Sequence, residues 1–179
     1  QKAANQSGII LPTYQAWYDK SIDNTSYDPG AAAHVLQAAG YTKGSDGIYK
    51  SPGGQRLSFT IQTITGYTDW DSSLQVIQQE LQAAGFDVKV VDEDNGSVYV
   101  PNLQAGKFTL AYGEQTGGPA PYYELRQMLF SGNIGSTNYS RFSSASTDAL
   151  FNQYASASAS QQVQIIHQIS TVLTKEIPF

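Results

Sequence analysis

Residues 57–90 open with Leu57-Ser-Phe-Thr-Ile-Gln62 and close with Phe86-Asp-Val-Lys-Val90, and the fold class follows from them. In both end segments apolar and polar residues alternate, which is the pattern of a strand with one buried face. The stretch between them is predicted to be a helix that ends at Gly85, with its buried face formed by Leu74, Ile77, Leu81 and Ala84. A strand, a helix and a strand with short connections predict a βαβ unit with two parallel strands.

Two smaller elements come before this unit. A helix is predicted between Asp28, its N-cap, and Gly40, its C-terminal stop, with Pro29 in the first helical position. The apolar face of that helix is Ala32, Val35, Leu36 and Ala39. A hairpin is predicted around Ile48-Tyr49, because turn-forming clusters lie on both sides of this pair.

Residues 1–26 show no sustained periodicity and are predicted to be a linker. Three aromatic residues of this segment either anchor it against the domain or contact a ligand, and anchoring is the simpler reading: Tyr14, Trp17 and Tyr18. Both ends of the sequence suggest a domain excised from a longer protein, since the first residues carry no signal sequence and the last follow a helix directly.

After the βαβ unit, the pattern predicts an acidic turn over residues 92–96, a short helix over 98–104 and a strand over 108–112. The last of these is expected to be buried, because Phe108, Leu110 and Tyr112 alternate with Thr109 and Ala111. Three helices follow. The first carries Tyr122, Leu125, Met128 and Leu129 and ends near Ser131-Gly132-Asn133, and the second is capped by Ser146 or Thr147 and buries Ala149, Leu150 and Tyr154. The third carries Val163, Ile166, Ile169 and Leu173 on one stripe and stops at Pro178.

Together these elements predict an α/β fold: a single three-layer lobe over residues 27–179, with a short mixed, partly parallel sheet flanked by helices. The net charge of −5 gives no basic surface, so nucleic acid is not an expected partner. The sequence contains no apolar run of about 18 residues, so no membrane-spanning helix is predicted. It also contains no cysteine, which excludes a disulfide framework and thiolate zinc sites.

The sequence gives no positive support for an enzyme, a metal site or a cofactor. Its two histidines, His34 and His167, lie far apart inside predicted helices, and no third nitrogen or sulfur ligand accompanies them. The acidic turn departs from a calcium loop, because its glycine comes one position early and the closing glutamate is absent. Asp69 and Asp71 are better explained as charges at the N-terminus of the central helix.

Two loops are candidates for ligand binding. The first runs from Tyr112 to Tyr123, where Gly113, Gly117, Gly118, Pro119 and Pro121 exclude regular structure. Aromatic residues on a flexible loop at the end of a strand are typical of binding sites in α/β proteins. The second loop, residues 65–70, follows the first strand of the βαβ unit and contains Tyr67 and Trp70. For each aromatic residue, burial in the core is an equally good explanation.

Five segments in this order resemble one family, the dipeptide- and oligopeptide-type solute-binding proteins of ABC importers (solute-binding family 5). They are Tyr27-Asp-Pro to Ala39-Gly-Tyr41, the hairpin from Asp46 to Leu57, Ile77 to Val88, Gly106-Lys-Phe108, and Asn138 to Leu150 with the closing Ile177-Pro178. The resemblance implies that the chain is the C-terminal lobe of a larger two-lobed receptor. Such a receptor is extracytoplasmic and lipid-anchored, traps its ligand between the lobes and delivers it to a membrane permease.

The resemblance also implies roles for the aromatic loop. In peptide-binding members of the family, a Trp and an Asp that binds the α-ammonium of the ligand follow the strand; Tyr112 and Gln115 take these positions here. Glu114 is adjacent, but it would point elsewhere in an extended segment. A neutral amide cannot balance a buried ammonium. Five aromatic residues suit stacking on sugar rings, as in the oligosaccharide-binding branch: Tyr67, Trp70, Tyr112, Tyr122 and Tyr123.

The expected ligand is therefore a peptide or an oligosaccharide, and the latter is favoured by Gln115. Two other classes of function stay open at this point. One is a hydrolase that uses Asp69, Asp71 or Glu114, and the other is a sensor or adhesion module with the same receptor fold.

Overall fold

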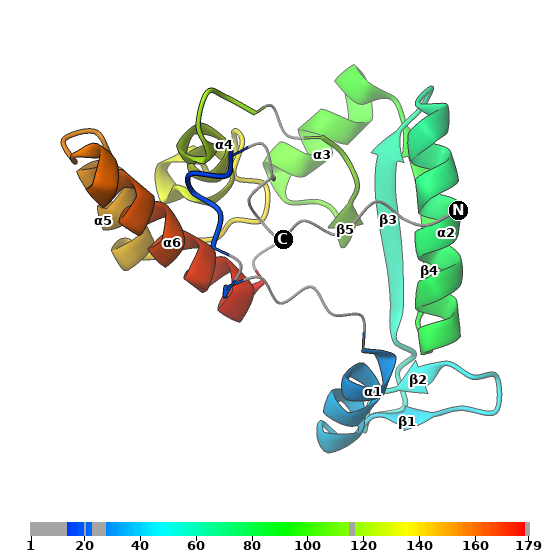
Figure 1. The fold of residues 1–179 in the computed structure, drawn as a ribbon. Helices are drawn as coiled ribbons and strands as arrows, with labels where there is room; N and C mark the ends of the chain where they lie inside the picture. Colours follow the sequence, from blue (N-terminus) through cyan, green and yellow to red (C-terminus); the bar gives the residue numbers. More distant parts are fainter. Residues whose placement is uncertain (1–13, 20, 23–27, 115–116, 178–179) are drawn as a thin grey trace. The chain divides into compact units, whose positions relative to one another are not determined.

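The computed structural model describes residues 14–19, 21–22, 28–114 and 117–177 (Figure 1). Its internal contacts form two compact units, one of residues 27–114 and one of residues 1–26 with 115–179. We call the first the sheet unit and the second the helical unit. The division into a linker over 1–26 and a single lobe over 27–179 stays a prediction.

A three-stranded parallel sheet forms the centre of the sheet unit. Strand β3 (Ser58–Ile64) lies between β4 (Asp87–Glu93) and β5 (Leu110–Ala111). Helix α2 (Thr68–Ala84) connects β3 to β4, so the predicted βαβ unit and the α/β class are confirmed (Figure 1). Since all three strands run in one direction, their carboxyl ends meet at one edge of the sheet.

The core of the sheet unit lies between α2 and the sheet. Its fully buried members are Ile61, Leu74 and Val88, and the partly buried residues packed around them are Phe59, Ile77, Leu81, Phe86, Val90 and Tyr112. The predicted stop at Gly85 is confirmed, since this residue has φ 105° and a Cβ there would lie 2.6 Å from the Tyr49 ring. The loop predicted over 65–70 is shorter than expected, because residues 68–70 already belong to α2, whose first turn is stabilised by Asp69 and Asp71.

Helix α1 (Pro29–Ala38) has the predicted caps, and its apolar face is not buried. The Asp28 carboxylate accepts the Ala31 N–H at 2.8 Å, and Gly40 has φ 83° with the N–H bonds of a Schellman ending around it. None of the ten residues of α1, all of them described, is buried, and Val35 is 68% exposed. Apolar spacing shows which face of the helix could be buried, and no segment in the described part of the chain covers that face.

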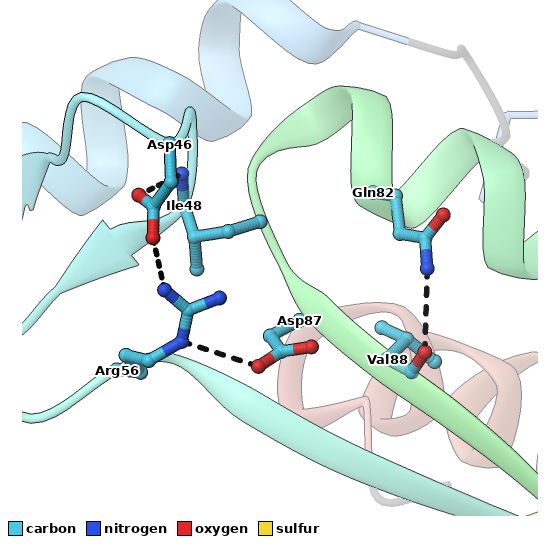
Figure 2. Close-up of polar contacts among 6 residues, drawn as sticks. All are labelled: Asp46, Ile48, Arg56, Gln82, Asp87 and Val88. Atoms are coloured by element: carbon cyan, nitrogen blue, oxygen red, sulfur yellow. Dashed lines mark hydrogen bonds and ion pairs between the residues drawn. The ribbon is translucent and has the colours of Figure 1, made fainter.

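The predicted hairpin is confirmed as β1 (Thr42–Lys43) and β2 (Tyr49–Lys50), which pair antiparallel. Arg56 connects this hairpin to the sheet, since its guanidinium pairs with Asp46 of the turn and with Asp87 of β4 (Figure 2). Asp46 also accepts the Ile48 N–H at 3.2 Å. The Ile48 bond first and then the Arg56 bond lower the pKa of Asp46 below its usual value. The hairpin is thereby fixed at the amino ends of the strands.

Beyond β4 the chain is more ordered than the predicted acidic turn. Residues 92 and 93 belong to β4, and Asp94 caps a π-helical turn, η2 (Asn95–Tyr99), which continues into α3 (Val100–Ala105). The Asp94 carboxylate accepts the N–H and the hydroxyl of Ser97, and the hydroxyl bond first and the N–H bond second lower its pKa. Capping by a short acidic side chain, which the charge pattern alone does not reveal, accounts for the difference.

The prediction of a buried strand over 108–112 was wrong. Only Leu110 and Ala111 pair with β3, and both are exposed, Leu110 by 41%. Alternation identifies which side chains share a face, but the paired part of this strand is only two residues long, and Leu110 is left uncovered. The short helix before it, with Pro101 in its first turn, is confirmed.

The helical unit contains α4 (Pro121–Leu129), the short turn η3 (Ser131–Asn133), α5 (Ala145–Tyr154) and α6 (Ala159–Glu176). Its core consists of Leu125, Leu129, Phe151, Tyr154, Ile165, Ile166, Ile169 and Leu173. Tyr14, Trp17 and Tyr18 pack against this core, which confirms that they anchor the N-terminal segment.

Two details of α5 differ from the sequence pattern, whereas the buried stripe of α6 agrees with it. The cap of α5 is Ser144, whose hydroxyl accepts the Thr147 N–H at 3.3 Å, and the residues predicted as caps lie inside the helix. Thr147, Phe151 and Tyr154 are its buried residues, which have the i, i+4, i+7 spacing of one helix face, whereas Ala149 lies on the opposite face and is exposed. The stripe of α6 is confirmed at Ile166, Ile169 and Leu173, and Val163 is half-buried. Pro178 lies outside the described residues.

Asn138 organises the irregular segment between α4 and α5. Its side chain is fully buried, and Nδ2 donates to the Phe130 carbonyl at 3.1 Å and to the Phe142 carbonyl at 2.8 Å. Its Oδ1 accepts the Ser140 hydroxyl at 3.2 Å. One amide thus connects both ends of residues 130–142 in place of regular secondary structure.

Candidate functional site

Three aromatic side chains meet at the carboxyl edge of the parallel sheet. Tyr67 and Trp70 follow β3, and their rings stack with centroids 4.5 Å apart and planes at 22°. Tyr112 follows β5 and meets Trp70 edge-on, with centroids 5.8 Å apart at 85°. We call Tyr67, Trp70 and Tyr112 the aromatic platform. The structure thus brings together three of the residues predicted to bind ligand, and Tyr67 is 42% exposed.

The backbone of Tyr112 is held by hydrogen bonds to two elements, β3 and η2. Its N–H donates to the Gln62 carbonyl at 2.8 Å, which extends the pairing of β5 with β3 by one bond. Its carbonyl accepts two side-chain hydroxyls, Thr63 Oγ1 at 3.2 Å and Tyr99 Oη at 3.0 Å. Thr63 ends the buried face of β3, and Tyr99 closes η2 after β4. All three strand ends therefore contribute to this edge.

Sequence reasoning did not find Thr63 and Tyr99. A weak signal for Thr63 exists, because alternation places it on the same face as buried Ile61, where a hydroxyl needs a partner. Tyr99 had no such signal, since its place depends on the π-helical turn.

The polar residues predicted beside the platform are less well defined. Glu114 is exposed, and Gln115 lies outside the described residues. Asp69 and Asp71 lie in the first turn of α2, as their helix N-terminal role predicts. The described part of the site therefore offers aromatic surface and hydroxyls.

The remaining predicted aromatics belong to the helical unit and differ from each other. Tyr122 stacks on Tyr154 with centroids 4.1 Å apart at 12° and meets Phe151 edge-on, as a core residue does. Tyr123 is 48% exposed. Burial raises the pKa of Glu124, the next residue of α4, above its usual value. The assignment of ligand contact to Tyr122 and Tyr123 stays a prediction.

The described residues contain no group of three or more histidines, cysteines, aspartates or glutamates arranged to hold a metal ion. His34 is exposed on α1, and His167 Nδ1 lies 3.8 Å from Asp19 Oδ2. In the part of the chain that the structure describes, no helix is long and apolar enough to cross a membrane.

Residues 1–137 match the model of a protein family described as "Bacterial extracellular solute-binding proteins, family 5 Middle". The match covers more than half of the chain, and the chain belongs to this family. The expected resemblance is thereby confirmed, and it is carried by the sheet unit and by the segment around α4.

Individual relatives agree with this assignment. A probable ABC transporter-binding protein of Deinococcus radiodurans is 35% identical over 82 residues, which are 45% of this chain and 14% of that protein. A mannohexaose-bound periplasmic oligopeptide-binding protein of an oligopeptide ABC transporter from Thermotoga maritima has a TM-score of 0.83 and 25% identity. That similarity covers 94% of this chain and 33% of the Thermotoga protein, so the chain spans about a third of it.

A more distant structure shares the fold. The periplasmic binding protein MelB of Agrobacterium fabrum C58, in complex with stachyose, has a TM-score of 0.76 and 16% identity over 90% of this chain and 27% of its own. The family and these neighbours are solute-binding proteins, so the comparisons give no support to the hydrolase alternative.

Proposed function

We propose that the chain is a ligand-binding lobe of an extracytoplasmic solute-binding protein that captures an oligosaccharide or a peptide and delivers it to an ABC permease. The observation that carries the proposal is the aromatic platform at the carboxyl edge of a parallel sheet, in a chain of this family. Ligands of open α/β sheets bind at this edge, because loops from several strands converge there.

An oligosaccharide fits the platform better than a charged peptide terminus does. The stacked pair of Tyr67 and Trp70 presents a flat apolar surface with a polar margin, and a sugar ring also has apolar C–H faces and polar edges. A peptide ammonium would need an acidic partner, and Gln115 supplies a neutral amide. The Thermotoga relative binds mannohexaose and the Agrobacterium protein binds stachyose, which supports the same choice.

The share of the Thermotoga protein that this chain covers indicates where the rest of the receptor would come from. Because the chain spans about a third of its structural relative, the other lobe would be supplied by the remainder of the same polypeptide. Closure of the two lobes around a hinge would then bury the ligand before delivery. An extracytoplasmic location with a lipid anchor on the full-length protein completes the proposal.

The test is calorimetry on the full-length polypeptide that contains this chain, with mannohexaose, stachyose and a nonapeptide as ligands. We expect binding of an oligosaccharide, and Trp70→Ala should weaken it about tenfold through loss of the stacking surface. Val76→Ala, on an exposed position of the same helix, is the control and should leave affinity unchanged. Binding of the peptide alone would reverse the choice of ligand, and binding of neither class would refute the proposal.

A further inference from the structure

The carbonyl of Tyr112 has two hydroxyl donors from two different elements, Thr63 of β3 and Tyr99 of η2. We infer that these two residues are positioning residues, which fix Tyr112 and, through its contact with Trp70, the aromatic platform before ligand arrives. The inference rests on the proposed function only for what the platform binds. The arrangement itself is a property of the sheet unit.

These two hydrogen bonds are needed because the pairing of β5 with β3 is too short to fix the position of Tyr112 alone. Only two residues of β5 pair with β3, and the strand lies at the sheet edge with Leu110 exposed. After Tyr112 comes Gly113, which places no restraint of its own on the backbone. The N–H of Tyr112 is bound by Gln62 and its carbonyl by the two hydroxyls, so the last residue before the loop is held on both sides.

The donors are themselves fixed. Thr63 is fully buried in β3, and Tyr99 is 4% exposed at the end of η2. Asp94 determines where that turn begins, since its carboxylate accepts the Ser97 N–H at 2.9 Å and its carbonyl accepts the Tyr99 N–H at 2.8 Å. The Tyr99 hydroxyl, on a capped turn that follows β4, therefore reaches the Tyr112 carbonyl from a fixed position.

Gly113 shows how closely the groups approach one another. A Cβ at this position would lie 2.7 Å from Tyr99 Oη and 3.9 Å from Trp70 Cζ3. A residue larger than glycine would therefore displace the hydroxyl from the carbonyl. Gly96 in η2 is the matched control, because a Cβ there meets nothing within 4 Å and its φ is not positive.

The first test needs no ligand. The chain contains two tryptophans, so Trp17→Phe leaves Trp70 as a single reporter inside the platform. In that background we expect acrylamide quenching of Trp70 to increase with Tyr99→Phe and further when Thr63→Val is added. The control is Tyr49→Phe, which removes a hydroxyl from an equally buried tyrosine, 3% exposed, at the amino ends of the strands and should leave quenching unchanged.

The second test measures mannohexaose affinity of the full-length polypeptide. Each single variant, Tyr99→Phe or Thr63→Val, should weaken binding about threefold, because one donor still holds the carbonyl. The double variant should weaken it about thirtyfold, which exceeds the product of the single effects, because the last donor is then lost. Gly113→Ala should behave like the Tyr99 variant and Gly96→Ala like the wild type.

The outcomes separate the two ideas. Unchanged quenching in the double variant, or increased quenching with affinity within twofold of wild type, overturns the positioning role. If the double variant does not fold, the same quenching and affinity criteria are applied to Tyr99→Phe, Thr63→Val and the two glycine variants. If the wild-type receptor binds neither mannohexaose nor a nonapeptide, the proposed function fails, and quenching of Trp70 still decides whether Thr63 and Tyr99 order the platform.

Discussion

Asn138→Asp exchanges one buried amide for a carboxyl of the same shape, and we expect it to destabilise the helical unit strongly at neutral pH. The Asn138 amide donates to the Phe130 and Phe142 carbonyls. The Phe130 carbonyl also accepts the Asn133 N–H, so the Phe142 carbonyl is the more affected of the two. A carboxylate offers no donor and directs negative charge at both oxygens.

The magnitude follows from these contacts. Removing a donor from a buried acceptor costs about 1–3 kcal/mol, and leaving an uncompensated buried charge costs about 3–5 kcal/mol. We therefore expect Asn138→Leu, which removes the donor without adding charge, to cost about 1–3 kcal/mol. Asn138→Asp should cost about 3–5 kcal/mol at pH 7, a large part of the roughly 5–15 kcal/mol that stabilises a typical domain.

The two variants should also differ in pH dependence. Burial against carbonyl oxygens disfavours the charged carboxylate, so the folded pKa of an aspartate at this site lies above the unfolded value of about 3.9. Stability of Asn138→Asp is then highest when the carboxyl is protonated and is lost as pH rises through the folded pKa. Asn138→Leu has no titrating group and should show no additional pH dependence.

The assay is urea unfolding from pH 4 to pH 8, followed by the fluorescence of Trp17 in a Trp70→Phe background. Trp17 packs against the core of the helical unit, so its emission reports on that unit. Asn152→Asp, the same substitution at an exposed position in the last turn of α5, is the control and should change stability by less than about 1 kcal/mol. Equal effects of the two aspartate variants, or no loss of stability with rising pH, would refute the reasoning.

Three further outcomes follow from the fold. Ser144→Ala should cost about 0.5–2 kcal/mol in urea unfolding because it removes the cap of α5, whereas Ser146→Ala should cost less than about 0.5 kcal/mol; the reverse order would show that the helix starts later. Leu74→Ala should cost about 2–5 kcal/mol through a cavity under the sheet, against less than about 0.5 kcal/mol for exposed Val76→Ala on the same helix. Protection of the hairpin amides from hydrogen exchange should persist above the unfolded aspartate pKa of about 3.9 and decrease as pH falls through the lowered pKa of Asp46. High salt should also weaken this protection, because it screens the Arg56 pair. Protection that depends on neither pH nor salt would contradict the role of the Asp46 carboxylate.

Local signals account for most of what could be predicted from the sequence. The βαβ unit follows from alternation and helical spacing, and the ends of α1 and α2 follow from Asp28, Gly40 and Gly85, because a cap depends on a few adjacent residues. Burial was predicted less well. Val35, in a correctly predicted helix, and Leu110, in a strand shorter than predicted, are apolar residues that no described segment covers.

In the candidate site too, local signals could be predicted from the sequence and contacts between distant residues could not. The positions of Tyr67, Trp70 and Tyr112 after predicted strands were sufficient to place them near one edge, because parallel strands end together. The hydroxyls that bind the Tyr112 carbonyl could not be predicted. Their donor–acceptor pairs join residues 13 and 49 positions apart, and no short pattern in a sequence encodes such a contact.

At the platform, side chains on or after all three strands act on the same few atoms. The β3 side supplies Thr63, Tyr67 and Trp70, the β4 side supplies Tyr99, and β5 supplies Tyr112. A shift of β5 by one residue would remove both hydroxyl bonds together with the edge-on contact to Trp70. A two-residue edge strand can therefore present an ordered aromatic surface, because side chains from its neighbours fix its last residue. Order that exists before binding lowers the entropy lost when ligand binds, so these contacts can contribute to affinity without touching the ligand.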